Sequence, residues 1–335
     1  MTSPKPYEQI TKELTEFMKS QKGVPWVKPW RSLRERGIDP TLRNAVSNHP
    51  YSGINVLSLG RRDFEDPRFV TFRQAKGLGG HVMKGEKGTH VIAVFEKVLK
   101  PGDRTWLNLE GQNKLARVEK DGYRVDNQVI PFKDAPDVKP PMVPRLYTVF
   151  NVNQCEDLKL PRLEPLTPVA KEERYRKAEE FIQNLGAKHS PSNRAFYSPN
   201  ADRVHWPSKG AFPDLDQYYA TAFHELGHWT GHESRLDRPF GREFGSPTYA
   251  KEELVAELTS AFLCQKHGIN GTLSHSGRYL NSWIKVLEDD PTVLVKAEKK
   301  AQEAVAFLEK PRAKEKTSMP ALTTKKPEKT LSMAR

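Results

Sequence analysis

The sequence predicts an α+β protein in which a small, basic N-terminal domain of mixed sheet and helix precedes a mostly helical domain. Three observations support this: strand-like and glycine-rich segments lie before residue 155, amphipathic helical patterns lie after residue 169, and positive charge is unevenly distributed. We divide the 335 residues into a domain 1–155, a linker 156–168, a domain 169–310 and a basic tail 311–335 that we expect to be disordered.

The formal net charge of +12 is concentrated towards the two ends of the chain. Residues 1–100 carry a net +8 and residues 311–335 a net +5, whereas residues 166–310 hold 19 basic and 20 acidic side chains. This asymmetry favours a nucleic-acid-binding N-terminal domain joined to a domain with different chemistry.

Composition excludes several classes of protein. The mean hydropathy is −0.71, and no apolar run is long enough to cross a membrane. The N-terminus has no apolar signal core, and Cys155 and Cys264 do not suggest a disulfide framework. We therefore expect a cytoplasmic protein with no membrane partner.

The N-terminal domain begins with an apolar stripe from Tyr7 to Met18 that predicts a helix ending at Gly23. Prolines make the next segment extended, and a glycine-rich turn precedes a strand from Thr89 to Val98. Residues 101–145 are expected to form a hairpin or an insertion, and residues 145–153 a strand.

Aromatic side chains among basic ones suit single-stranded DNA, because bases stack on the rings while cations follow the phosphates. Trp26 and Trp30 have this setting, although they are equally compatible with a core. The side chains interpreted as DNA contacts are Trp26, Lys28, Trp30, Arg31, Tyr51, Asn55, Phe72, Arg73, Lys84 and Lys87.

Helical patterns dominate the second domain. We predict a helix over 169–185, short strands over 195–206, and helices near 274–289 and 291–309. Between them, a helix capped by Asp214 and ended by a left-handed Gly231 carries the sequence His224-Glu225-Leu226-Gly227-His228. Histidines four residues apart share one helical face, so both can reach one metal ion, and Glu225 can deprotonate a water bound to it. This is a zinc metallohydrolase signature.

A second helix runs from Glu252 to about His267 and reads E-x-x-A-E from Glu253, as in gluzincin-type zincins. That similarity assigns Glu253 as the third ligand and Glu257 as the carboxylate that supports a ligating histidine. His232 lies about 12 Å along the helix from His224, too far to share its ion, and is interpreted as a pocket or supporting residue. The ligand set is thus His224, His228 and Glu253, for one Zn²⁺ or another divalent ion.

Alternatives remain at this stage. The two histidines could be satisfied members of a helical core, or the zinc site could be folded but catalytically idle. A donor for an oxyanion is not identified, with His232, His275 and Tyr279 as candidates, the last also compatible with packing beside Trp283. The loop 233–248 is a candidate lid over the site.

Longer motifs resemble a known family. Residues 50–55, 71–75 and 84–88 are similar to the N-terminal domain of ArdC antirestriction proteins, and residues 219–232 and 249–257 to its zincin-like metallopeptidase domain. The resemblance covers about residues 5–310 and extends to the N-terminal part of plasmid TraC primases. No primase catalytic domain follows, so we do not expect primer synthesis.

This resemblance implies single-stranded DNA binding, with weaker binding of duplex DNA, and protection of DNA entering a bacterium from restriction enzymes. It also implies a zinc site at His224, His228 and Glu253 with Glu225 as general base, acting on a peptide carbonyl. Three functions stay open: a DNA-shielding protein with an auxiliary or latent peptidase, a protease that destroys a host protein, and a DNA-binding module with purely structural zinc. Glu225 argues against the third, because a structural site needs no base.

Overall fold

The structure, a computed structural model, describes residues 5–21, 24, 38–62, 64–109, 112–135, 138–163, 170–241, 246–269 and 276–310. Several sequence-based predictions lie outside these ranges: the DNA contacts at Trp26, Lys28, Trp30 and Arg31, the candidate His275, and the disordered tail. No helix in the described ranges is both long and apolar enough to span a membrane.

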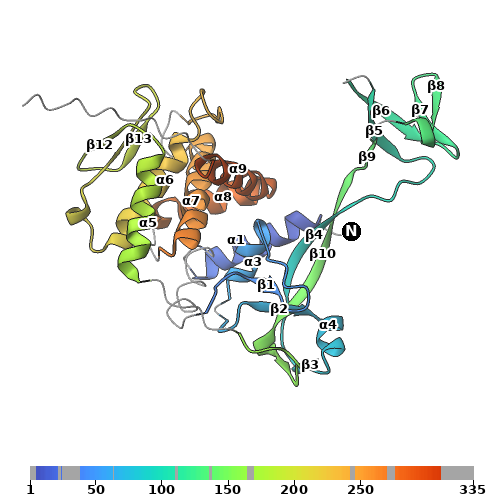
Figure 1. The fold of residues 1–335 in the computed structure, drawn as a ribbon, viewed down its shortest axis with the longest axis horizontal. Coiled ribbons are helices and arrows are strands. Elements are labelled where there is room, and N and C mark those ends of the chain that lie inside the picture. Colours follow the sequence, from blue (N-terminus) through green and yellow to red (C-terminus); the bar gives the residue numbers. More distant parts are fainter. Residues whose placement is uncertain are drawn as a thin grey trace, which may run out of the picture.

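A four-stranded sheet, in the order β1-β2-β10-β4, forms the centre of the N-terminal part (Figure 1). Its long antiparallel pair, β4 (Thr89–Glu96) and β10 (Met142–Asn151), continues upward as an arm. The short elements at its lower end are β1 (Arg43–Asn44), α3 (Ile54–Gly60), β2 (Arg68–Thr71), α4 (Phe72–Gly77), and the pair β3 (His81–Val82) and β11 (Cys155–Glu156).

The predicted hairpin or insertion is a five-stranded antiparallel sheet at the far end of this arm, which we call the lobe (Figure 1). Its buried face is apolar and holds a small core of its own around Leu107, Val118 and Tyr123. The strand order is β8-β7-β6-β5-β9, with bounds β5 Arg104–Leu109, β6 Gln112–Val118, β7 Gly122–Val125, β8 Gln128–Pro131 and β9 Val138–Lys139.

The C-terminal part is mostly helical, as predicted. A small three-stranded sheet, in the order β12-β14-β13, lies beside α6. The helices are α5 (Lys171–Asn184), α6 (Leu215–Trp229), α7 (Pro247–His267), α8 (Ser276–Asp289) and α9 (Thr292–Leu308), and the strands are β12 (His189–Pro191), β13 (Phe196–Ser198) and β14 (Arg203–Trp206).

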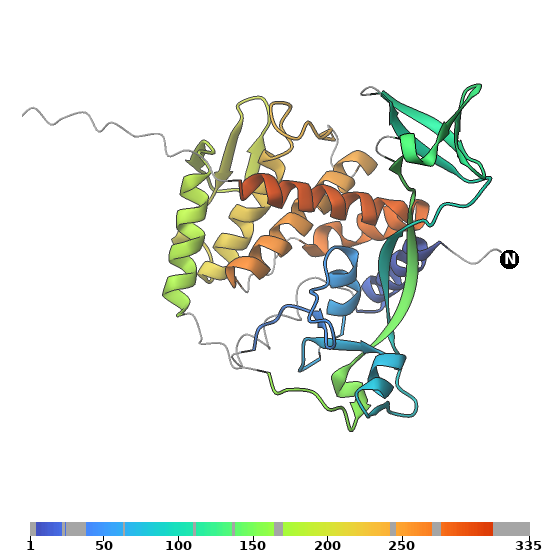
Figure 2. The ribbon, with the colours of Figure 1, turned by 45° about the vertical axis from the view of Figure 1, so that its right-hand side comes forward.

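The first helix, α1 (Pro6–Gln21), joins the two parts. It lies between the arm and the C-terminal helices in both views (Figures 1 and 2). The apolar stripe predicted from the sequence is fully buried at Ile10, Leu14 and Met18, in the same core as Trp283 and Leu294. The two parts therefore share one hydrophobic core, rather than only a linker as the sequence suggested.

The polar face of α1 is tied to the N-terminal sheet through Glu13. Its carboxylate accepts a hydrogen bond from Arg61 at 2.7 Å and lies 2.5 Å from Nδ1 of His90. These bonds keep the pKa of Glu13 below its usual value, although burial alone would raise it. One helix thus contacts both parts, because its charged side is bonded to Arg61, to His90 and, through Lys19, to Glu288 of α8, while its apolar side lies in the shared core.

Replacing Leu14 by alanine should therefore destabilise the whole chain, not only the N-terminal part. We expect the free energy of unfolding to fall by about 2 to 5 kcal/mol, because a fully buried leucine leaves a cavity in the shared core. Urea unfolding followed by circular dichroism measures this. Lys12→Ala, at an exposed position of the same helix, is the control and should change stability by less than about 0.5 kcal/mol. Equal effects of the two substitutions would contradict the shared core.

Candidate metal centre

Helix α6 begins as predicted but ends differently. The Asp214 side chain accepts a hydrogen bond of 2.8 Å from the backbone N–H of Gln217, which caps the helix. The prediction of a left-handed C-cap at Gly231 is wrong: the cap is Thr230, and Gly231 does not have a positive φ. Gly231 is needed for space instead, because a Cβ there would lie 2.9 Å from Arg238 and from the Phe240 ring.

Helix α7 begins and ends at residues that commonly cap helices, and it packs closely on α6. Ser246 caps its start, and Gly268 ends it in the left-handed conformation with φ 69°. The close approach occurs at Gly227, where a Cβ would lie 3.1 Å from the Cα of Ala256. The absence of a side chain at this position lets the two helices bring their functional residues together.

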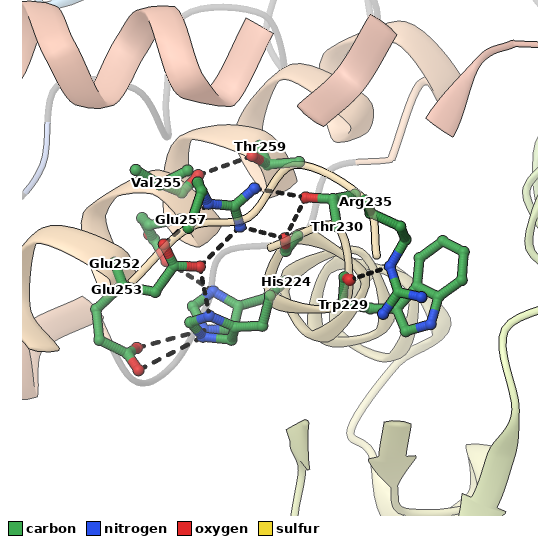
Figure 3. Close-up of polar contacts among 12 residues, drawn as sticks. His224, Trp229, Thr230, Arg235, Glu252, Glu253, Val255, Glu257 and Thr259 are labelled. Carbon is green, nitrogen blue, oxygen red and sulfur yellow. Dashed lines mark hydrogen bonds and ion pairs between the residues drawn. The ribbon is translucent and has the colours of Figure 1, made fainter. Parts of the chain in front are cut away.

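Three side chains from α6 and α7 converge on one point. Nε2 of His224 and Nε2 of His228 are 3.2 Å apart, and each lies 3.4 Å from a different oxygen of Glu253. Figure 3 shows the carboxylate of Glu253 directed at the histidine rings. The predicted ligand set is therefore assembled, and its ligand atoms all lie within 4.8 Å of one another.

This geometry fits a single metal ion. Two ligands bonded at about 2.05 Å to a tetrahedral ion lie about 3.3 Å apart, which is close to the separation of the two imidazole nitrogens and of each nitrogen from its own oxygen of Glu253. The donor chemistry fits as well, since two imidazoles and a carboxylate are typical ligands of divalent transition metals. Among the residues that the structure describes, the buried Nδ1 of His224 has no hydrogen-bond partner. Its nearest carboxylate is Glu257 at 3.7 Å, on the side where we predicted a supporting residue.

A second supporting carboxylate, Glu252, was not recognised in the sequence. One of its oxygens lies 3.3 Å from Nδ1 of His228 and also accepts a hydrogen bond of 2.7 Å from Arg238. The other accepts from Nε of Arg238 at 2.9 Å. The sequence did contain an indication of this role. Glu252 directly precedes Glu253 on a helix, so its side chain points about 100° away from that of Glu253 and can reach His228.

Arg238 holds this arrangement together from the loop after α6. Its guanidinium is buried and also donates to the backbone oxygen of Gly227 and to Thr230. The loop 233–248 was a candidate lid, but Arg238 and Arg235 fasten its described first half, with the Arg235 guanidinium 4.1 Å from the centre of the Trp229 ring. Residues 242–245 lie outside the described ranges.

His232 was expected to line or support the site. Its Nδ1 instead lies 2.8 Å from the hydroxyl of Ser234, two residues further along. The place beside His228 is taken by Glu252. His205 in β14 stacks on Phe196 with ring centres 4.4 Å apart.

Glu225 is buried next to the candidate ligands, and the backbone of Tyr197 in β13 favours its charged form. Burial raises the pKa of Glu225, against the opposite effect of the two histidines. On the other side, the hydroxyl of Tyr249 is hydrogen-bonded to Glu253 and lies 3.2 Å from that of Tyr279. Tyr279 also packs beside Trp283, with ring centres 5.8 Å apart, as the packing alternative predicted, and its role as an oxyanion donor stays a prediction.

The residues predicted to contact DNA separate into two groups. Phe72, with 63% of its surface exposed, lies with the exposed Arg73, Lys84 and Lys87 around α4 and the turn after β3. Tyr51 is half-buried, edge-on against Phe69. The amide of Asn55 is occupied by two hydrogen bonds of 2.7 Å to the backbone of Ile92, so it fastens α3 to β4.

Replacing Glu252 by glutamine should lower the affinity for a divalent ion about 10- to 100-fold, because the substitution removes the carboxylate that orients His228. Competition with a chromophoric chelator measures this affinity. Glu233→Gln, at an exposed position of the loop after α6, is the matched control. Thermal unfolding checks that E252Q is folded, and an unchanged affinity in the folded variant would contradict the assignment.

Metal binding should release protons at neutral pH. Burial would lower the pKa of His228, but Glu253 and Glu252 raise it to about 10 in the metal-free protein. A ligating imidazole must be neutral, so the affinity should increase as the pH rises from 6.5 towards 10. By the same linkage, the stability that protonated His228 gives the metal-free protein is complete below pH 6.5 and is lost as the pH rises through about 10. Titration calorimetry in two buffers of different ionisation enthalpy counts the protons, and equal heats would contradict the prediction.

Comparisons with known proteins agree with this architecture. Residues 4–150 match the N-terminal domain of anti-restriction factor ArdC, and residues 176–300 match a zincin-like metallopeptidase family. DNA primase TraC of Escherichia coli is 38% identical over 325 residues, covering 94% of this chain but 28% of TraC. The chain thus spans less than a third of that relative. The uncharacterized protein y4eC of Sinorhizobium fredii is 30% identical, with 90% of this chain and 91% of y4eC covered.

Solved structures of the antirestriction ArdC protein from plasmid R388 are also similar. The Mn(II)-bound and metal-free forms give TM-scores of 0.59 and 0.61 at 30% sequence identity, covering 90% of this chain and 96% of theirs. The similarity extends over both parts of the molecule and includes a relative with a bound divalent metal. The chain belongs to the ArdC family of antirestriction proteins, with an ArdC N-terminal domain followed by a zincin-like domain.

Proposed function

We propose that this protein binds single-stranded DNA in the bacterial cytoplasm and protects incoming plasmid or phage DNA from host restriction endonucleases. Membership of the ArdC family supports the antirestriction role. The net charge of +8 over residues 1–100 supports an acidic partner, because Lys and Arg neutralise phosphates and release counterions. The same charge would also attract duplex DNA, and we expect weaker binding there because paired bases cannot stack on an aromatic side chain.

The observation that carries DNA binding is the exposed ring of Phe72 beside three exposed cations. Phe72 is the first residue of α4, where the chain leaves β2, and 63% of its surface is exposed. Arg73 is its neighbour, and Lys84 and Lys87 lie in the turn that follows β3. A base can stack on the phenyl ring while the cations neutralise the adjoining phosphates.

We further propose that the C-terminal part is a metallopeptidase-like site. His224, His228 and Glu253 would hold one divalent ion, with zinc as the expected metal, and such an ion would acidify a water and polarise a peptide carbonyl. Glu225 would accept the proton of that water, and its raised pKa supports a role in donating the proton onward. Glu252, Glu257 and Arg238 act by fixing the histidine rings.

A second candidate function is an active protease that cleaves a host protein, with DNA binding as the means of targeting. The buried Glu225 beside a complete ligand set favours it, because purely structural metal sites need no general base. The remaining alternative, a DNA-binding module with structural metal, leaves the position of Glu225 without a purpose.

One experiment separates these functions. An unmodified plasmid is transferred into a restricting host that expresses the wild type, the triple variant R73S/K84S/K87S, or E225Q. We expect the triple variant to lose protection. Its affinity for single strands should also depend less on salt: the slope of log affinity against log salt concentration should be smaller by about 2, because three phosphate contacts are removed. We expect E225Q to protect like the wild type.

The matched control is K188S/K285S/K299S, which removes three exposed charges from the C-terminal part and should leave protection intact. Loss of protection by E225Q, with metal and DNA affinity unchanged, would replace shielding by proteolysis as the function. Full protection by the triple variant would refute DNA binding at this surface.

A further inference from the structure

The lobe presents one face to solvent. Along β5 the side chains alternate, so that Thr105 and Leu107 are buried, whereas Arg104 and Trp106 are exposed. Strand register places the residues paired with them on the same outer face. In Figures 1 and 2 the lobe stands clear of the helical part, at the end of the arm opposite α4 and β3.

Three arginines lie in one row across this outer face. Arg104 pairs with Arg117, and Arg117 pairs with Arg124, on three neighbouring strands. Like charges opposite one another destabilise a sheet. Glu119 is hydrogen-bonded to Arg124 and also interacts electrostatically with Arg117, but within the described ranges no carboxylate lies within ion-pair distance of Arg104 or Arg117. The row therefore offers positive charge to an external anion.

An exposed indole lies next to this row. Trp106 follows Arg104 by two residues, so it points to the same face, and 49% of its surface is exposed. Its partner on β6 is Leu115, which is 46% exposed. Large apolar side chains on the open face of a small sheet indicate a binding surface rather than a core.

We propose that this outer face of the lobe is a second contact surface for single-stranded nucleic acid. The guanidinium groups of Arg104 and Arg117 bind phosphates, and a base stacks on Trp106 beside Leu115. Duplex DNA offers the same phosphates but keeps its bases stacked on one another, and an acidic peptide offers charge but no base for the indole. The proposal rests on the proposed single-strand binding and extends it to a surface remote from Phe72.

The test is fluorescence anisotropy of a labelled deoxythymidine oligonucleotide with the full-length protein over a salt series. We expect W106A to bind about 5- to 100-fold more weakly, as for loss of one stacked base, and W106F to retain most of the affinity. R104S/R117S should make the slope of log affinity against log salt concentration smaller by about 1.4. The control K114Q/K133Q also removes two exposed charges from the lobe, but Lys114 pairs with the buried Leu107 and so lies off the outer face.

Each other outcome has a definite meaning. Wild-type affinity in W106A and R104S/R117S, with loss in R73S/K84S/K87S, would overturn the lobe surface and leave the proposed function standing. Equal weakening by K114Q/K133Q would also overturn it, because charge alone would then suffice. Binding of polyglutamate that depends on Arg104 and Arg117, with oligonucleotide binding unchanged, would assign the face to an acidic protein instead. Failure of the wild type to bind any single strand would refute both proposals.

Discussion

The candidate metal centre depends on the distance between α6 and α7 at Gly227. With hydrogen in place of a side chain there, the backbone of Ala256 comes within van der Waals range of α6. This contact sets how far Glu253 reaches towards the two histidines. A methyl group at position 227 would push against the backbone of α7, which cannot move as a flexible side chain can. The ligand separation of 3.2 to 3.4 Å is therefore a consequence of helix packing.

Close packing also buries several charged side chains of the site, and each of them faces a group of opposite charge. Glu253 faces both histidines, Glu252 faces His228, and Arg238 donates to Glu252 and to the backbone of α6. Burying a charged side chain without a partner costs several kcal/mol of folding free energy, so each of these side chains needs a neighbour of opposite charge. Arg238 ends the series by attaching the following loop to the site. The loop and the ligands are consequently parts of one network.

The N-terminal part is similarly coupled to the helices. Because α1 contributes Ile10, Leu14 and Met18 to a core that contains Trp283, the N-terminal sheet and the helices of the candidate metal centre are held together by shared apolar burial. The β4–β10 arm lies against α1 and carries the lobe away from this core. The surfaces proposed for DNA thus lie at the two ends of the arm, outside the tightly packed region, where exposed rings and cations remain available.

Sequence alone determined the features that depend on local spacing. The histidines of α6, the Asp214 cap and the end of α7 at His267 follow from helical spacing and local end signals, which need no knowledge of the rest of the chain, whereas α7 begins at Pro247, five residues before the predicted Glu252. The convergence of His224, His228 and Glu253 was also predicted, because the motif of Glu253 is similar to that of gluzincins. Only the tertiary structure revealed the roles of Arg238 and Glu252, the spatial reason for Gly231, and the placement of α1 in the helical core. Each of these depends on a contact between separate elements, and local sequence patterns do not predict such contacts.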